Sequence, residues 1–113
     1  MASKRAVLGW GYLILAIFFE VAGTTFMKLS DGFSKTIPSI TMFVFYLLSL
    51  TALTFALKRF EVSMAYAIWS GLGTALITII GILIFRESVS AVKIFSIALI
   101  IIGVVGLQLT AKH

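Results

Sequence analysis

The apolar residues of the chain fall into four long blocks separated by short polar segments. Each block has about 18–22 residues, and a helix of that length spans the roughly 30 Å hydrocarbon core of a bilayer. The polar segments carry turn signals, such as Ser30-Asp31-Gly32 ahead of Pro38. The pattern therefore predicts a single all-α domain, residues 1–113, in which four transmembrane helices form a bundle at about residues 6–27, 38–57, 64–85 and 91–109.

The composition supports an integral membrane protein. Of the 113 residues, 61% are hydrophobic and 12% are charged, whereas a soluble domain is about half apolar and about a quarter charged. Four spans leave no soluble domain for a nucleotide site, which argues against an ATP-driven pump, and we expect no enzyme activity. The net charge of +5 fits basic loops. Because the charges are few, they form no basic stripe for nucleic acid.

The chain contains no cysteine. Disulfides and thiolate metal sites are therefore excluded, and we expect neither a metal nor a cofactor. The basic start at residues 1–5, ahead of an apolar run, is similar to a signal peptide. Because three more spans follow and the run is too long, we interpret this segment as the start of the first transmembrane helix.

One acidic residue, Glu20, lies inside the first apolar block, and the run from Ala6 to Met27 contains no other charged side chain. An ionised acid near the middle of a membrane costs roughly 2.5–3.5 kcal/mol on insertion scales, and more by other estimates. Such a position indicates function. The alternative is a buried acid paired with a basic residue, but the other long apolar runs contain no lysine or arginine apart from Lys93 at the start of the fourth.

The residues that share a helix face with Glu20 describe a cavity wall. Steps of three, four and seven along the helix lead to Leu13, Ala16, Ile17, Gly23, Thr24 and Met27. Ala16 and Gly23 are small and leave volume near the carboxylate, and Thr24 adds a hydroxyl one turn away. Alternatively, Ala16 and Gly23 only allow close packing between helices.

Aromatic residues of the second and third helices are candidates for binding a cation. The hydroxyl of Tyr46, near the middle of its helix, needs a partner. Tyr66, Trp69 and Gly73 fall on one face of the third helix, and two rings there suit an organic cation through cation–π attraction of roughly 0.5–2 kcal/mol each. Plain packing is the alternative for Trp69. Gly71 and Gly73 favour a bend, and hence a hinge, in this helix.

The fourth helix carries no ionisable group beyond Lys93 at its start, and Ser88 or Ser90 can cap it. Small residues, which let membrane helices approach closely, recur along its length. We expect this helix to form a self-association surface; the alternative is packing within the monomer. The small residues are Ser96, Gly103 and Gly106.

The loop charges do not favour one orientation in the membrane. One side carries Lys4, Arg5, Lys58, Arg59 and Lys112, and the other carries Lys28, Lys35, Arg86 and Lys93. This near tie permits an antiparallel homodimer, although a distinct partner subunit could set the orientation instead. Four helices are too few to enclose a path with two gates, and so a dimer with both Glu20 residues in one chamber is the smallest sensible unit.

The buried carboxyl group can relieve its insertion penalty by binding a proton. Protons and an organic cation then compete for the same anionic site. If that site opens to one side of the membrane at a time, mutual exclusion is sufficient for antiport, and the proton gradient drives cation export.

Three segments closely resemble the small multidrug resistance family of four-helix bacterial exporters. They are Phe19–Lys28 with Ser30–Phe33, Ile37–Ser39, and Ala65–Gly73. The resemblance covers nearly all of the chain. It implies that the helix-one glutamate binds proton or substrate, that aromatic residues of the third helix line the pocket, and that the fourth helix makes an antiparallel dimer in the bacterial inner membrane.

The resemblance also implies a substrate class. Gly23-Thr24-Thr25 is similar to the branch that exports quaternary ammonium and lipophilic aromatic cations, because the guanidinium branch usually has a tryptophan there. Ser96 departs from the family, in which many members have glycine, and this weakens the transfer of the dimer interface. The residues that take over the family's roles are Glu20, Tyr46, Tyr66 and Trp69, with Thr24 and Ser70 near the glutamate.

Other functions remain open from the sequence. The chain could move small cations or solutes such as guanidinium, choline or betaine, or act as one subunit of a heterodimeric exporter. A non-transporting membrane subunit or assembly factor is a third reading, but such a protein has no need of an unpaired acid inside the membrane.

Overall fold

The computed structural model describes residues 4–110, and the side chains of residues 7–109. Throughout this part of the chain the regular structure is helical, without strands. The all-α prediction is therefore confirmed. The helices lie within one or two residues of the ranges expected from the sequence: α1 (Lys4–Leu29), α2 (Thr36–Ala56), α3 (Val62–Leu83) and α4 (Ala91–Thr110).

Every helix is long and apolar enough to cross a membrane. The spans are Val7–Leu29, Thr36–Ala56, Val62–Leu83 and Ala91–Leu109. At 1.5 Å per residue, even a span of 19 residues covers roughly 28 Å, which matches the hydrocarbon core. The chain is thus a multi-pass membrane protein, as its four apolar blocks predict.

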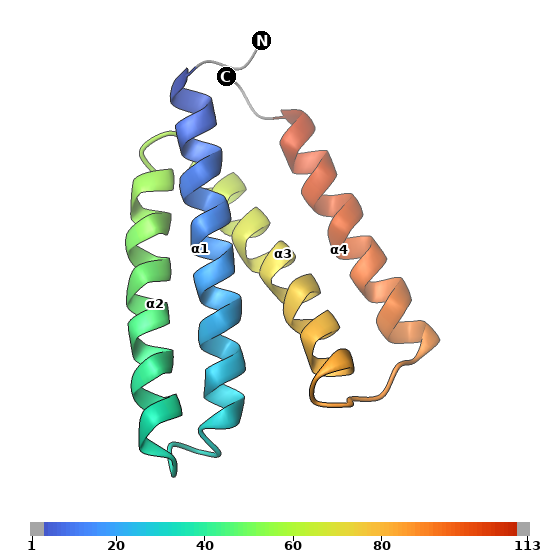
Figure 1. The fold of residues 1–113 in the computed structure, drawn as a ribbon. Coiled ribbons are helices and arrows are strands. Elements are labelled where there is room, and N and C mark those ends of the chain that lie inside the picture. Colours follow the sequence, from blue (N-terminus) through green and yellow to red (C-terminus); the bar gives the residue numbers. More distant parts are fainter. Residues whose placement is uncertain (1–3, 111–113) are drawn as a thin grey trace.

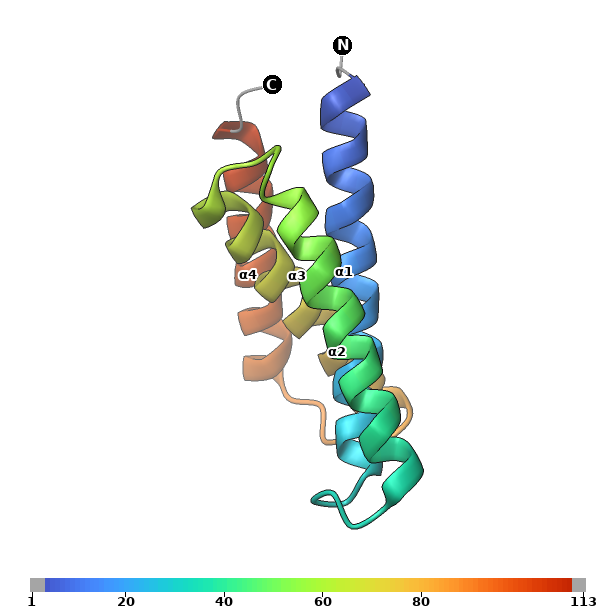
Figure 2. The ribbon, with the colours of Figure 1, turned by 90° about the vertical axis from the view of Figure 1, so that its left-hand side faces the viewer.

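The four helices run up and down in turn (Figure 1). The α1–α2 and α3–α4 loops lie at one end of the bundle, and the α2–α3 loop lies at the other. The α1 helix packs against both α2 and α3, whereas α4 packs mainly against α3. Figure 2 shows from the side how α2 crosses in front of the α1–α3 pair. The interior of the molecule therefore lies among α1, α2 and α3.

Small residues bring these three helices close together. Ala16 of α1, Ala56 of α2 and Ala65 of α3 are fully buried, together with Leu13 and Ile68. By contrast, Val104 is the buried residue that α4 contributes to this core over the described range. The α4 helix is therefore the least covered element of the fold.

The helix ends follow the local sequence signals. Pro38 is the third residue of α2, still in the first turn, where its missing N–H has no helical acceptor to lose. Ser90 caps α4, because its Oγ accepts the backbone N–H of Lys93 at 3.1 Å. This confirms Ser90 rather than Ser88 as the cap; the carbonyl of Ser88 instead accepts Lys93 Nζ at 2.7 Å.

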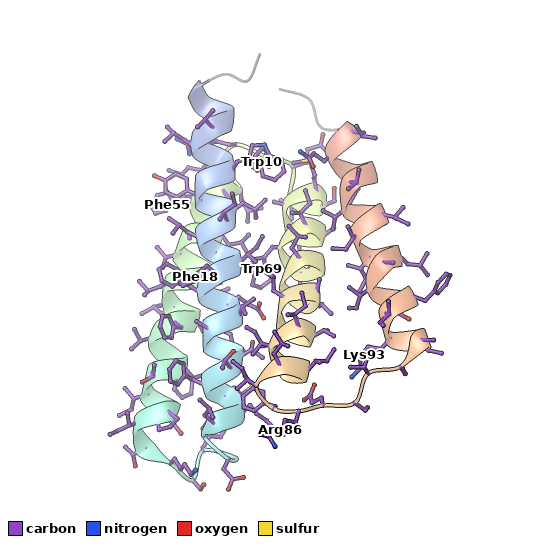
Figure 3. All side chains as sticks on the ribbon, turned by 45° about the vertical axis from the view of Figure 1, so that its right-hand side comes forward. Trp10, Phe18, Phe55, Trp69, Arg86 and Lys93 are labelled. Carbon is purple, nitrogen blue, oxygen red and sulfur yellow. The ribbon has the colours of Figure 1, made fainter. Side chains whose placement is uncertain are left out.

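The charge count from the sequence is only partly represented in the structure. Lys112 lies outside the described residues, as do the side chains of Lys4 and Arg5. Residues 1–3 and 111–113 of the expected domain also lie outside them. Figure 3 shows Arg86 and Lys93 near the end of the bundle that holds the α3–α4 loop. The orientation in the membrane stays a prediction.

Candidate functional site

The carboxyl group of Glu20 projects from α1 toward α3 and is partly buried. A Cβ placed on Gly73 would lie 2.7 Å from Glu20 Oε2, so the carboxylate occupies the space that any other residue at position 73 would fill. Oε2 is buried and accepts no hydrogen bond from the described residues. The glycine therefore lets an acid of one helix lie directly against the backbone of another.

The second oxygen of this carboxylate belongs to a chain of hydroxyl groups. Thr24 Oγ1 donates to Glu20 Oε1 at 3.1 Å, and Thr24 Oγ1 lies 2.6 Å from the hydroxyl oxygen of Tyr46. A threonine hydroxyl has one hydrogen to donate. Because Thr24 donates it to Glu20, Tyr46 is the donor to Thr24. The α1 carboxylate is thereby connected to α2.

Gly23 positions the ring of Tyr46. A Cβ on Gly23 would lie 2.9 Å from Tyr46 Cδ1 and 3.0 Å from Cε1, so the ring packs directly against the glycine. Of the two roles considered for Gly23, this contact corresponds to close packing between helices, because the ring fills the space beside the glycine. It allows α1 and α2 to approach closely, and this approach brings the Tyr46 hydroxyl to Thr24.

A second polar junction lies one turn before Glu20. The backbone carbonyl of Ala16 accepts Ser49 Oγ of α2 at 2.6 Å and Trp69 Nε1 of α3 at 3.4 Å. Ser49 is completely buried. Sequence reasoning missed this residue, although a lone serine in the middle of an apolar helix is a signal that a buried hydroxyl has an acceptor nearby.

Tyr66 and Trp69 form an aromatic pair on α3. Their ring centroids are 5.4 Å apart with an interplanar angle of 60°, and Figure 3 places Trp69 between α1 and α3. Tyr66 is 57% exposed, whereas Trp69 also packs against the core. Trp69 thus has the packing role considered as its alternative, and Tyr66 presents an open ring.

Three of the expected site residues make other contacts than those predicted from the sequence. Ser70 Oγ donates to the Tyr66 carbonyl of its own helix at 2.8 Å, and so its hydrogen is not available to Glu20. Ala16 and Ile17 are buried in the helix core rather than bordering open space near the carboxylate. Ala16 contributes its carbonyl to the polar junction, and Ile17 borders an apolar groove between α1 and α3.

The two glycines proposed as a hinge lie in an uninterrupted part of α3. A Cβ on Gly71 would lie 3.0 Å from Val104 Cγ2 and 3.2 Å from Ile100 Cγ2, so Gly71 lets α4 approach α3. Gly73 accommodates Glu20 as described above. Each glycine thus has a contact that explains it, and a hinge at this place stays a prediction.

The small residues of α4 face away from the rest of the chain. Ser96, Gly103 and Gly106 are all exposed, and no described atom outside the local helix lies within 4 Å of a Cβ built on either glycine. These residues therefore do not serve packing within the monomer. The proposed self-association surface is open in the single chain.

A cavity of about 430 Å³ adjoins the carboxylate network; we call it the loop-side cavity. It lies between the last turns of α1 and α3, near the α3–α4 loop. Thr24, the hydroxyl donor to Glu20, forms part of its wall, together with Met27, Lys28, Thr78, Phe85 and Glu87. The described residues contain no group of His, Cys, Asp and Glu that could hold a metal ion.

Comparison with known proteins gives a consistent result. The model of the family described as Small Multidrug Resistance protein matches residues 8–100. An uncharacterized membrane protein of Bacillus subtilis (strain 168), YvaE, is 57% identical over 102 residues, covering 90% of this chain and 86% of the relative.

Two further relatives have functional names. The multidrug resistance protein EbrB of Bacillus subtilis (strain 168) is 46% identical over 102 residues, covering 90% of this chain and 87% of the relative. The quaternary ammonium compound-resistance protein QacC of Staphylococcus aureus is 42% identical over 98 residues, covering 87% of this chain and 92% of the relative.

Proposed function

Because the chain belongs to the small multidrug resistance family, we propose that it is a proton-coupled antiporter of the bacterial inner membrane that exports quaternary ammonium and lipophilic aromatic cations. Membership places this multi-pass bacterial membrane protein among resistance proteins and not among enzymes. The names of EbrB and QacC refer to multidrug and quaternary ammonium compound resistance. Those names support the substrate class.

The single observation that carries the proposal is the hydrogen bonding of the Glu20 carboxylate, which leaves one of its oxygens without a donor among the described residues. One oxygen accepts a hydroxyl hydrogen from Thr24, while the other is buried against Gly73 without a donor among the described residues. A buried carboxylate that lacks donors is stabilised by a proton or by a cation. Both ligands act on the same oxygen atoms, and so each excludes the other.

The neighbouring side chains have two roles, orienting the carboxylate and binding the cation. Thr24 and Tyr46 hold the carboxylate in orientation through their hydroxyl chain. The rings of Tyr66 and Trp69 attract the organic cation, with roughly 0.5–2 kcal/mol for each ring. When the cation binds, Glu20 releases its proton to the side that is open; when a proton binds from the other side, the cation leaves.

The remaining assignments follow from this mechanism. Gly71 and Gly73 act as a hinge that lets α3 move, and Ser70 contributes a hydroxyl to the pocket when it leaves its backbone acceptor. A homodimer formed through α4 supplies the second half of the chamber, with one Glu20 from each subunit. Each subunit spans the lipid bilayer with its four helices.

Proton release is the direct test. Purified protein at pH 7–8 should release protons when tetraphenylphosphonium is added, as followed with a pH indicator in weak buffer. Glu20→Gln should abolish the release, and Glu61→Gln, which changes an exposed acid at the start of α3, should leave it intact. The absence of release from the unmodified protein, or equal release from Glu20→Gln, would contradict the mechanism.

The substrate class needs a separate measurement. Liposomes with a proton gradient should take up quaternary ammonium and aromatic cations. Guanidinium, choline and betaine are the competing substrates, and each should displace tetraphenylphosphonium only at concentrations about tenfold higher or more. Tighter binding of guanidinium or choline would assign the protein to small solutes instead.

A further inference from the structure

The loop-side cavity contains a second acidic residue that the exchange at Glu20 does not use. Glu87 lies in the α3–α4 loop and forms part of the cavity wall. Thr24 forms another part of this wall and also donates its hydroxyl hydrogen to Glu20. Thr24 therefore belongs to both sites, and the cavity extends from it toward the α3–α4 loop.

The backbone at the end of α3 fixes the place of Glu87. Arg86 has a φ of 55°, in the left-handed region, which turns the chain back toward the helix. The N–H of Glu87 then donates to the carbonyl of Gly81 at 3.0 Å. The Glu87 carboxylate lies directly against Gly81, where a Cβ would collide with it. An acid is thus held on the wall of the cavity by a glycine, as Glu20 is held by Gly73.

The cavity has the chemistry of a site for an organic cation. Its volume of about 430 Å³ lies in the range of small-molecule sites. The ring of Phe85 and the thioether of Met27 offer apolar, polarizable surface for the body of a ligand, and Glu87 offers a negative charge for its cationic head. The hydroxyls of Thr24 and Thr78 and the ammonium group of Lys28 are further polar groups of the wall.

Lys28 lowers the affinity that we expect of the loop-side cavity for a cation. This residue borders the same cavity from the exposed end of α1. Its positive charge opposes an incoming cation and partly offsets Glu87. Binding here is therefore weak, which suits a site on a transport path, because a ligand must enter such a site and also leave it.

Building on the proposed function, we propose that the loop-side cavity is an outer binding site for the organic cation, in which Glu87 and Phe85 hold the cation before it reaches Glu20. The two sites share Thr24 but have separate carboxylates. A cation can then occupy the outer site while Glu20 still carries its proton. Loading of the cation therefore precedes proton release.

The test separates the outer site from the Glu20 site by removing the latter. The full-length Glu20→Gln variant is titrated with benzyltrimethylammonium, and backbone amide shifts of Thr78 and Gly81 are followed by NMR. We expect weak, saturable shifts at both residues. Adding Glu87→Gln should weaken this binding about tenfold. Glu61 is the N-cap of α3, next to the α2–α3 loop, which lies at the opposite end of the bundle (Figure 1), and adding Glu61→Gln should leave the binding unchanged.

A further variant, Gly81→Ala, keeps the negative charge of Glu87 but displaces its carboxylate. Gly81→Ala places a methyl group where the Glu87 carboxylate lies, and the flexible side chain must turn away. In the Glu20→Gln background this variant should also weaken benzyltrimethylammonium binding, while circular dichroism confirms an intact helix content.

The outcomes distinguish this proposal from the proposed function. No shifts at Thr78 and Gly81 in Glu20→Gln, or equal binding with and without Glu87, would overturn the outer site. Failure of proton release in the unmodified protein would instead overturn the coupling at Glu20. The outer site would then remain supported if its binding still depended on Glu87.

Discussion

At the scale of single residues, glycines decide where the two acidic groups lie. Gly73 admits the carboxylate of Glu20 and Gly81 admits that of Glu87, because each lacks the Cβ that would collide with an oxygen atom. Gly23 does the same for the ring of Tyr46. Positions of this kind act on function through geometry, since none of the three glycines brings a chemical group of its own.

Substitution of Gly73 should weaken cation binding without unfolding the protein. Gly73→Ala places a Cβ at 2.7 Å from Glu20 Oε2, and the carboxylate at the end of its flexible side chain must move away. We expect tetraphenylphosphonium affinity to fall about tenfold, measured by equilibrium binding, with an unchanged circular dichroism spectrum.

The matched control for this substitution is Gly11→Ala. No described atom beyond its own helix lies within 4 Å of a Cβ at Gly11, and alanine is the better helix former. Its affinity should equal that of the unmodified protein. Equal affinities for Gly73→Ala and Gly11→Ala would show that the close contact does not position Glu20.

The Thr24 hydroxyl should matter through its hydrogen bonds rather than its size. Thr24→Val keeps the shape but removes both the donor to Glu20 and the acceptor for Tyr46. A hydrogen bond to a charged group contributes about 1.5–3 kcal/mol, so cation affinity should fall by about tenfold or more. Thr24→Ser restores the hydroxyl and should rescue binding; a Thr24→Ser variant as weak as Thr24→Val would point to shape instead.

The pairing of Glu20 with Thr24 could be predicted from the sequence because both residues lie on one helix. The four-residue step from Glu20 to Thr24 is fixed by helix geometry, and the structure joins the two by a hydrogen bond. Contacts between helices depend on their relative rotation and height, which periodicity does not determine. For this reason Ser49 was missed, and the hydroxyl of Ser70 was expected near Glu20 although it bonds its own helix.

At the scale of the helices, α1 is hydrogen-bonded to both of the helices that pack against it, α2 and α3. Its Ala16 carbonyl accepts a hydroxyl of α2 and an indole N–H of α3. Along α3, the hydroxyls of Ser70, Thr74 and Thr78 each donate to the carbonyl four residues earlier. Such bonds back to the helix backbone favour bending. They therefore support the proposed hinge in α3 independently of Gly71 and Gly73.

Loss of the Ser49 hydroxyl should destabilise the packing of α1 on α2. Ser49→Ala removes a completely buried interhelical hydrogen bond of 2.6 Å. Bonds of this kind in membrane proteins contribute about 0.6 kcal/mol on average and at most about 2 kcal/mol, and we expect about 1 kcal/mol. Reversible unfolding in mixed detergent with sodium dodecyl sulfate would measure this loss in the free energy of unfolding.

Ser39→Ala provides the comparison for this measurement. The Ser39 hydroxyl is exposed and donates only to Lys35 of the adjoining turn, also at 2.6 Å. Its removal should change the free energy of unfolding by less than about 0.5 kcal/mol. If both variants lost the same stability, the interhelical bond would have no special role.

At the scale of the whole molecule, the four spans are unequally covered by their own chain. In the most apolar window, 33% of α1 is buried but only 6% of α4. The exposed face of α4 contains the small residues Ser96, Gly103 and Gly106. The number and length of the helices were predictable from the apolar blocks. The fourth block was also expected to form a self-association surface, and its span is the most apolar, with a mean hydropathy of 2.3 against 1.7–1.8 for the other three. How the first three helices pack around one another was not predictable, because their blocks are similarly apolar.

Cysteine crosslinking can test α4 as a dimer interface, since the native chain has no cysteine. Chains with Gly103→Cys, co-expressed with chains that carry Ser96→Cys, should form a disulfide-linked dimer in membranes after mild oxidation, as seen on a non-reducing gel. Val104→Cys is the control, because Val104 is buried against the core of its own chain. Dimer formation by Val104→Cys alone would place the interface elsewhere.

The same approach separates antiparallel from parallel pairing. Ser96 and Gly103 lie seven residues apart, or about 10.5 Å along the helix axis. Parallel helices allow Ser96→Cys and Gly103→Cys each to link to its own copy, whereas antiparallel helices favour links between the two variants when they are co-expressed. The mixed link should therefore dominate; two equally efficient links between identical variants would indicate parallel pairing.

The shared carbonyl of Ala16 also restricts how the transporter can move. A rotation of α1 alone would break the hydrogen bonds to Ser49 and Trp69 together. The rearrangement that breaks neither bond turns α1, α2 and the adjoining part of α3 as one rigid unit. Such a unit would swing past α4, which is attached to it mainly through α3, and so α4 would form the stationary frame of the cycle.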